Sequence, residues 1–188
     1  MYLMMVFLIV LAVPAAAQER PAVRPQHDVA VTYRADGTDA NGRPETHQIR
    51  MSWTDQGRRM RLEMAGQPGF ALVDFAASRM TMVLLQQHSF IELPFDPQHA
   101  PGLDIPASVS MTRAGTDTVA GTPCILWDMK GPQGAGTACI TEDGLTLRLR
   151  EAGVSGSPAA LEAVSVAYGP QPADLFTVPP GLHPIMPR

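Results

Sequence analysis

The stretch that decides the fold is IRMSWTDQGRRMRLEM, residues 49–64. In both halves of this stretch, apolar side chains alternate with polar or charged ones, and Asp55–Gly57 between the halves has the composition of a turn. Because successive side chains of a β-strand point to opposite faces of a sheet, each half predicts a strand with one apolar face. We therefore expect two adjoining strands around a turn.

Period-two patterning extends outward from this stretch over most of the chain. Further alternating segments, or short apolar runs between turn residues, lie at 29–33, 70–75, 80–85, 89–93, 108–113, 118–120, 124–129, 137–141, 145–150 and 161–168. The chain thus carries about ten strands joined mostly by short turns, which predicts an antiparallel meander. Helical pattern is scarce: Phe75–Arg79 and Pro158–Ala163 are the best candidates, and residues 169–176 have room for one helical turn.

A mainly β chain with so little helix must cover its apolar strand faces in another way. A sheet with a long apolar face closes on itself, packs on a second sheet, or holds something else there. The pattern is therefore a hint of a hydrophobic cavity, and a β-sandwich satisfies it equally well.

The first residues have the composition of an export signal. Residues 1–13 form an uncharged apolar run, Pro14 ends it, and Ala15–Ala17 supply the small residues that a signal peptidase reads. The run is shorter than the roughly 20 residues of a transmembrane helix. The start of the run carries no Lys or Arg, which is atypical of an export signal, and an uncleaved anchor is the alternative interpretation. We expect cleavage after Ala17 and a periplasmic or secreted protein.

The rest of the chain is the size of one domain. The expected organisation is a signal peptide at 1–17, a flexible leader at 18–26, a β domain at 27–182 and a tail at 183–188. In an exported chain, the two cysteines, Cys124 and Cys139, favour a disulfide. They flank a run of turn residues, so we expect them to face each other across a hairpin. The alternative, a redox pair, is less favoured because the spacing is far from Cys-x-x-Cys.

Charge and motifs argue against several function classes. The formal net charge is −4, with acids and bases interspersed, so nucleic acid is not an expected partner. Gly153–Ser157 resembles a nucleophile elbow but has Ser in place of the second Gly. Gly131–Thr137 has the glycines of a phosphate loop without its Lys, and we interpret it as a turn. We expect a protein that is not an enzyme.

Histidine and methionine are the residues that bear on metals. The five histidines are scattered along the chain, so no metal site and no cofactor are predicted. Methionine is plentiful, and copper binding through Met and His is a minor alternative. The methionines occupy apolar strand positions, where they fill a core or line a deformable surface for flexible chains.

The candidate ligand-binding face follows from the cleanest strands. Its residues are Ile49, Met51, Trp53, Met60, Leu62, Met64, Met82 and Leu84. If they line a cavity, they contact lipid-like groups; if they form a dry core, they contact only each other. The pattern alone leaves both possibilities open.

Five segments resemble a family of exported bacterial envelope proteins that is itself similar to the LolA-type carriers of outer-membrane lipoproteins. They are Val73–Val83, His88–Leu93, Gly115–Cys124, Ala138–Arg148 and Leu175–Gly181. The resemblance implies a LolA/LppX-like half-barrel: a single curved antiparallel sheet whose concave apolar face is covered by a lid. The cysteine pair belongs to the pattern of the same family, and this supports a structural disulfide.

The resemblance also implies a function. LolA-type carriers shelter the acyl chains of a lipoprotein, so we expect a lipid, a lipoprotein acyl chain or another apolar ligand on the concave face, with transient contact to the membrane or to envelope proteins. The alternative is an envelope interaction or assembly module with a self-filled core. This chain lacks the helices that cover the carriers, and Pro94–Pro106 is the candidate lid.

Overall fold

The computed structural model describes residues 20–39, 41–96, 105–132, 134–152 and 158–186. The strands are β1 (Val29–Thr38), β2 (Pro44–Thr54), β3 (Arg59–Met64), β4 (Gly69–Asp74), β5 (Arg79–Leu84), β6 (Ser89–Pro94), β7 (Ser110–Val119), β8 (Thr122–Gly131), β9 (Gly134–Ile140), β10 (Thr146–Ala152), β11 (Pro158–Tyr168) and β12 (His183–Pro184). Two 3₁₀ turns, η1 (Leu85–Gln87) and η3 (Ala173–Phe176), are the helical elements of the described residues.

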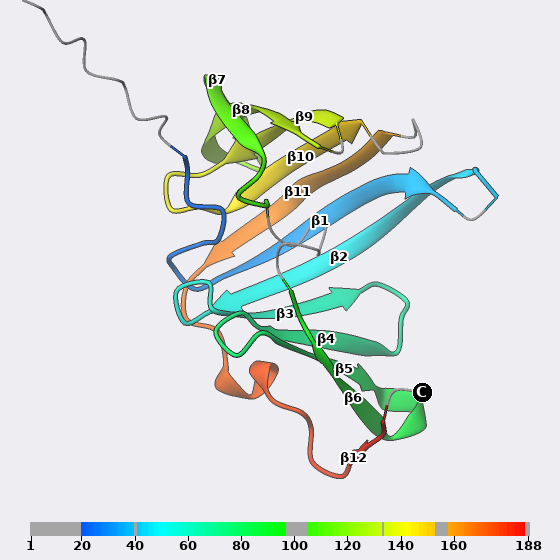
Figure 1. Ribbon diagram of the computed structural model, residues 1–188. Helices are drawn as coiled ribbons and strands as arrows, with labels where there is room; N and C mark the ends of the chain where they lie inside the picture. Colours follow the sequence, from blue (N-terminus) through cyan, green and yellow to red (C-terminus); the bar gives the residue numbers. More distant parts are fainter. Residues whose placement is uncertain (1–19, 40, 97–104, 133, 153–157, 187–188) are drawn as a thin grey trace, which may run out of the picture.

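All twelve strands belong to one open, curved sheet in the order β12-β6-β5-β4-β3-β2-β1-β11-β10-β9-β8-β7 (Figure 1). Neighbouring strands pair antiparallel, except that β12 is parallel to β6. The prediction of a single curved antiparallel sheet with few short helices is confirmed. A second sheet, as in a sandwich, is not present among the described residues.

The hairpin of residues 49–64 forms as predicted, with Ile49 opposite Met64, Met51 opposite Leu62 and Trp53 opposite Met60. Its turn, Asp55–Gly57, has three successive residues at positive φ. A Cβ at Gly57 would lie 2.7 Å from the Pro25 carbonyl oxygen, so the residues that precede β1 approach this turn too closely for any other side chain.

The structure differs from the sequence-based expectation at several elements. Pro158–Ala163 was a helix candidate and is instead the first half of β11, because pairing to β10 and β1 overrides the helix propensity of its alanines. Phe75–Arg79 mostly forms the turn between β4 and β5, and the segments 108–113 and 118–120 belong to one strand, β7. The predicted helical turn within 169–176 is confirmed as η3.

Residues on both sides of the expected β domain form hydrogen bonds with it. The Arg20 guanidinium donates hydrogen bonds to the carbonyl oxygens of Val109 at 2.6 Å and Ile105 at 2.8 Å. At the other end, His183–Pro184 of the expected tail pairs with the first two residues of β6. The residues on both sides of the expected β domain thus contribute contacts to it.

One connection has to traverse the sheet, because β6 and β7 lie toward opposite sides of it (Figure 1). Its described parts pack on apolar side chains: Phe95 belongs to a buried cluster with Trp53, and Ile105 packs on a second cluster around Trp127. Residues 97–104 of the candidate lid, Pro94–Pro106, lie outside the described residues. The described ends of that segment therefore act as cover for the sheet.

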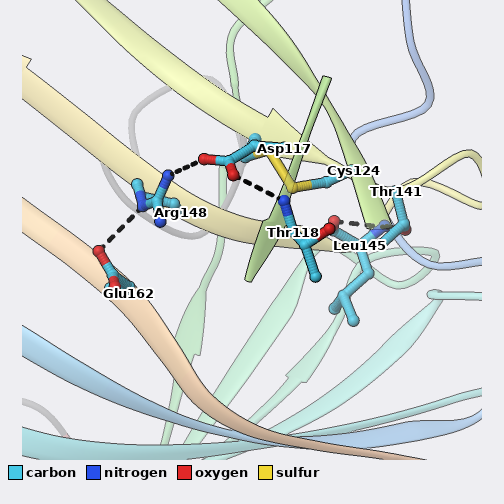
Figure 2. The surroundings of a disulfide bond; sticks show 8 residues. Asp117, Thr118, Cys124, Thr141, Leu145, Arg148 and Glu162 are labelled. Atoms are coloured by element: carbon cyan, nitrogen blue, oxygen red, sulfur yellow. Dashed lines mark hydrogen bonds and ion pairs between the residues drawn. A yellow bond between two sulfur atoms is a disulfide. The ribbon is translucent and has the colours of Figure 1, made fainter. Parts of the chain in front are cut away.

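Cys124 and Cys139 form a disulfide between β8 and β9, as the sequence predicts. Figure 2 shows the disulfide and its surroundings. Both cysteines are buried, and Val119 and Leu147 belong to the same apolar cluster. Burial within a sheet protects the bond from exchange with partner thiols, which favours the structural over the redox interpretation.

Removing this bond through Cys124→Ser is expected to cost about 2–5 kcal/mol in the free energy of unfolding. Chemical denaturation in oxidising buffer measures the loss. Reductant should destabilise the wild type by a similar amount and leave the variant unchanged. A wild-type midpoint that does not respond to reductant would show that the bond contributes nothing.

Candidate functional site

The eight predicted site residues lie on β2, β3 and β5 and share one face of the sheet, which we call the apolar face. Cross-strand pairing arranges this face in rows. The first row is Val29, Trp53, Met60, Val73, Met80 and Leu93; the second is Val31, Met51, Leu62, Ala71, Met82 and Ile91; the third contains Tyr33, Ile49, Met64 and Leu84. The hairpin residues meet directly, whereas Met82 and Leu84 join them across β4.

Burial varies along the second row: it is nearly complete at Val31 and least at Met82, and Leu62 is half-buried between the buried Met51 and Ala71. The exposed fraction is 1% at Val31, 5% at Met51, 8% at Ala71 and 36% at Met82. Leu62, Met64, Leu84 and Ile91 are half-buried. The apolar face therefore has a closed part on β1, β2 and the start of β3, and an open part formed by Leu62, Met64, Met82, Leu84 and Ile91.

The closed part is covered by residues from distant segments. The Trp53 and Phe75 rings stack at 5.7 Å, and Phe95 meets Phe75 edge-on at 5.4 Å. The Arg24 guanidinium lies 4.7 Å from the Phe75 ring centroid.

The cavity left between the leader and the closed part has a volume of about 30 Å³ and is lined in part by Val23, Pro25 and Trp53. This volume is close to that of one water molecule. Met51, Trp53 and Met60 are consequently side chains of a packed core, and the space for a ligand on this face lies over the open part.

The sequence did not indicate two residues of this face. Ile91 was within an expected strand, but Phe90, Ile91 and Leu93 give no clean alternation there. Ile185 follows β12, and its N–H donates to the Phe90 carbonyl at 2.9 Å. Since Pro184 pairs with Phe90, Ile185 extends the apolar face beyond β6, and 42% of it is exposed. A two-residue strand has no sequence signal.

The opposite face of β2–β4 carries a polar cleft of about 400 Å³, lined in part by Arg50, Arg61, Glu63 and Phe70. The Arg61 guanidinium lies over the Phe70 ring, at 3.4 Å from its centroid. It donates to Glu63 Oε1 at 2.7 Å and to the Leu175 carbonyl at 3.0 Å. Arg61 thereby fastens η3 to β3, which accounts for this charged group structurally.

A third cleft, of about 640 Å³, lies beside the disulfide, with Asp117 and Tyr168 among its lining residues. Arg148 donates to Asp117 at 2.6 Å and to Glu162 at 2.9 Å, so it links β7, β10 and β11 (Figure 2). Its hydrogen bond holds the pKa of the Asp117 carboxyl below the usual range, and the Thr118 N–H adds to the effect. Partial burial raises the pKa of Tyr168 to about 12, and its hydroxyl donates a hydrogen bond to Asp143 Oδ1.

The described histidines make separate contacts. The described residues contain no group of three or more His, Cys, Asp or Glu in a position to hold a metal ion. His27 contacts Asp143, His47 contacts Glu45 and His88 contacts the Leu85 carbonyl, in separate places. None of the described helical segments has the length and apolar character needed to cross a membrane.

No family model and no curated protein sequence matches this chain. Solved structures do match. An uncharacterized conserved protein from Thermus thermophilus has a TM-score of 0.60 and 13% identity, over 86% of this chain and 91% of the other. A chain in the MucA/MucB complex of Pseudomonas aeruginosa has a TM-score of 0.53 and 17% identity, over 84% of this chain. The protein described here spans 58% of that chain.

A LolA superfamily protein from Nitrosomonas europaea is also matched, with a TM-score of 0.45 and 10% identity, over 82% of this chain and 92% of the other. At such identities, a structural likeness shows the fold alone. The single open, curved antiparallel sheet predicted from the sequence is confirmed by the strand order. The disulfide fits an oxidising compartment.

The depressed pKa of Asp117 predicts a pH dependence of stability. Its carboxylate stabilises the fold above the unfolded pKa of about 3.9, and this contribution is lost as the pH falls through the lower folded pKa. Asp117→Asn should therefore lower the melting temperature at pH 7, and the difference from wild type should vanish near the acid end of the scale.

Thermal unfolding at a series of pH values measures this difference. Asp128→Asn, at an exposed position of neighbouring β8, is the matched control and should leave the melting curve nearly unchanged. An Asp117→Asn difference that is independent of pH would contradict the assignment to the charged carboxylate.

Proposed function

We propose that this protein is a non-enzymatic periplasmic binding protein that holds an apolar chain, such as a lipid or lipoprotein acyl chain, on the open part of the apolar face. The observation that carries this proposal is the second row, which passes from a packed core at Val31 to the exposed Met82 without a polar side chain. Contiguous apolar surface left open in this way is typical of a binding site.

The shape and chemistry of the open part suit a flexible chain. From Leu62 on β3 to Ile91 on β6, the row crosses three strand spacings, or about 14 Å. Met64 and Met82 supply deformable side chains that adapt to varied ligands. Each CH₂ group removed from water contributes about 0.8 kcal/mol, so an acyl chain along the row has a substantial driving force.

Export supports the same proposal. The disulfide fits an oxidising compartment, and an acyl chain that crosses an aqueous space needs a protein to shield it. We accordingly propose residues 1–17 as the signal peptide, with cleavage after Ala17. These residues lie outside those that the structure describes.

A second candidate function is an envelope module that binds a partner protein. The likeness to the chain in the MucA/MucB complex favours it, since MucB is bound to another protein in that structure. In this case, the open part would receive apolar side chains of the partner. Native mass spectrometry of protein purified gently from its host separates the two: a copurified lipid supports the first and a copurified polypeptide the second.

Binding of an acyl chain can be followed through Trp53. In the Trp127→Phe background, Trp53 is the one remaining tryptophan, and it lies one row from Met51 and Leu62. A fatty acid brominated on its chain is expected to quench Trp53 fluorescence saturably, because the bound chain lies near that row. A single clean mass in the native spectrum together with no quenching would refute the proposal.

Met82→Glu should weaken binding of the brominated fatty acid about tenfold or more, since it places a charge against an apolar chain and removes burial worth about 1.5–3 kcal/mol. Its effect on stability should stay within about 0.5 kcal/mol, because Met82 is exposed. Val164→Glu, at an exposed position of β11, is the control and should bind like wild type. Equal affinity of both variants would exclude the open part as the site.

A further inference from the structure

The open part of the apolar face ends at three neighbouring segments, which we call the rim. They are the β3–β4 turn (residues 65–68), η1 with His88, and residues 183–186. Strand pairing brings them together: Gly69 after the first segment pairs with Leu84 before the second. The His183 N–H donates to the His88 carbonyl at 3.0 Å, which joins the second to the third.

Exposed apolar side chains concentrate at the rim and beside it. The exposed fraction is 41% at Leu85, 42% at Ile185 and 91% at Met186, and Met82 lies next to them on β5. The other large hydrophobic residues that are exposed among the described ones, Val164 and Tyr168, are on β11. The rim is thus the place in the described structure where apolar side chains gather in water.

The two ends of these strands differ in charge. The rim contains no Asp, Glu, Lys or Arg. At the opposite end, the β2–β3 turn has an ion pair between Asp55 and Arg58. The residues that flank the β4–β5 turn are Asp74 and Arg79. Segments without charged residues, opposite turns that carry them on the same strands, are a distribution expected of a protein whose rim enters a lipid interface.

From these observations we infer that the rim docks on the surface of a phospholipid bilayer, with Leu85, Ile185 and Met186 inserted at the boundary of headgroups and acyl chains. The inference rests on the proposed function, because it gives the open part of the apolar face a direct route for a chain to and from the membrane. A bilayer needs no matching shape, only exposed apolar side chains, and the rim presents three of them on segments that themselves contain no charged residue.

The charges nearby define the lipid. The β1–β2 hairpin projects at the same end and carries Asp36, Asp39 and Glu45 together with Arg34 and Arg43, so this end has no excess of positive charge to attract anionic lipid. We therefore expect binding to zwitterionic phosphatidylethanolamine/phosphatidylcholine vesicles that anionic lipid does not strengthen. Binding should persist in high salt, since it does not depend on exposed ion pairs.

Vesicle flotation of the full exported protein tests the inference, with fatty-acid quenching in vesicle-free buffer as a separate readout. The double variant Leu85→Glu/Met186→Glu should reduce the vesicle-bound fraction about tenfold or more, because it puts charge into the interface. Neither residue belongs to the open part of the apolar face, so fatty-acid binding should remain. The control Val164→Glu/Thr116→Glu adds the same charge at exposed positions elsewhere and should float like wild type.

The outcomes separate the inference from the proposed function. Wild type that binds fatty acid but does not float with vesicles overturns the docking and leaves the proposed function intact. Flotation of the double variant at the wild-type level, or flotation that is lost in high salt, also overturns the docking. Wild type that floats but binds no fatty acid supports docking and refutes the proposed function.

Discussion

The structure depends on one constraint: a single sheet with an apolar face has to cover that face without helices. In the described residues, the cover is assembled from pieces of the chain that precede β1 or leave β6. Arg24 and Pro25 lie over the closed part, and Phe95 completes the stack of Trp53 and Phe75. Such cover is narrower than the sheet, so burial is complete at Val31 and incomplete at Met82.

The alternation of apolar and polar residues predicted the features that depend on pairing between strands adjacent in the sequence. The alternation in residues 49–64 predicted the turn at Asp55–Gly57 and the face to which Met51 and Leu62 belong, because register and alternation follow from neighbours in the sequence. It did not predict β12, whose two residues are held by β6 alone. Nor did it predict the first half of β11, where an alanine-rich segment is made a strand by its two neighbours.

The candidate site shows the same division. The alternation predicted that the eight residues share one face of the sheet, and they do. Which of them are packed and which are half-exposed depends on Pro25, Phe95 and Ile105, which come from segments without strand pattern, far from residues 49–64 in the sequence. Long-range cover of this kind has no local signal, so the sequence left both core and cavity open, and the structure contains a region of each character.

The partly covered face also has an energetic consequence. Extending the cover over Leu62 and Met82 would add to stability, at about 25 cal/mol for each Å² of apolar surface removed from water. The chain instead places the charged residues of the β2–β3 and β4–β5 turns at the opposite end of these strands and leaves the segments that contain Leu85 and Ile185 apolar and without charged residues. Exposed apolar surface without charges to protect it favours association in water. A partner that removes this surface from water would therefore stabilise the bound state, which is why the open part and the rim are best explained together, as two sections of one path for an apolar chain.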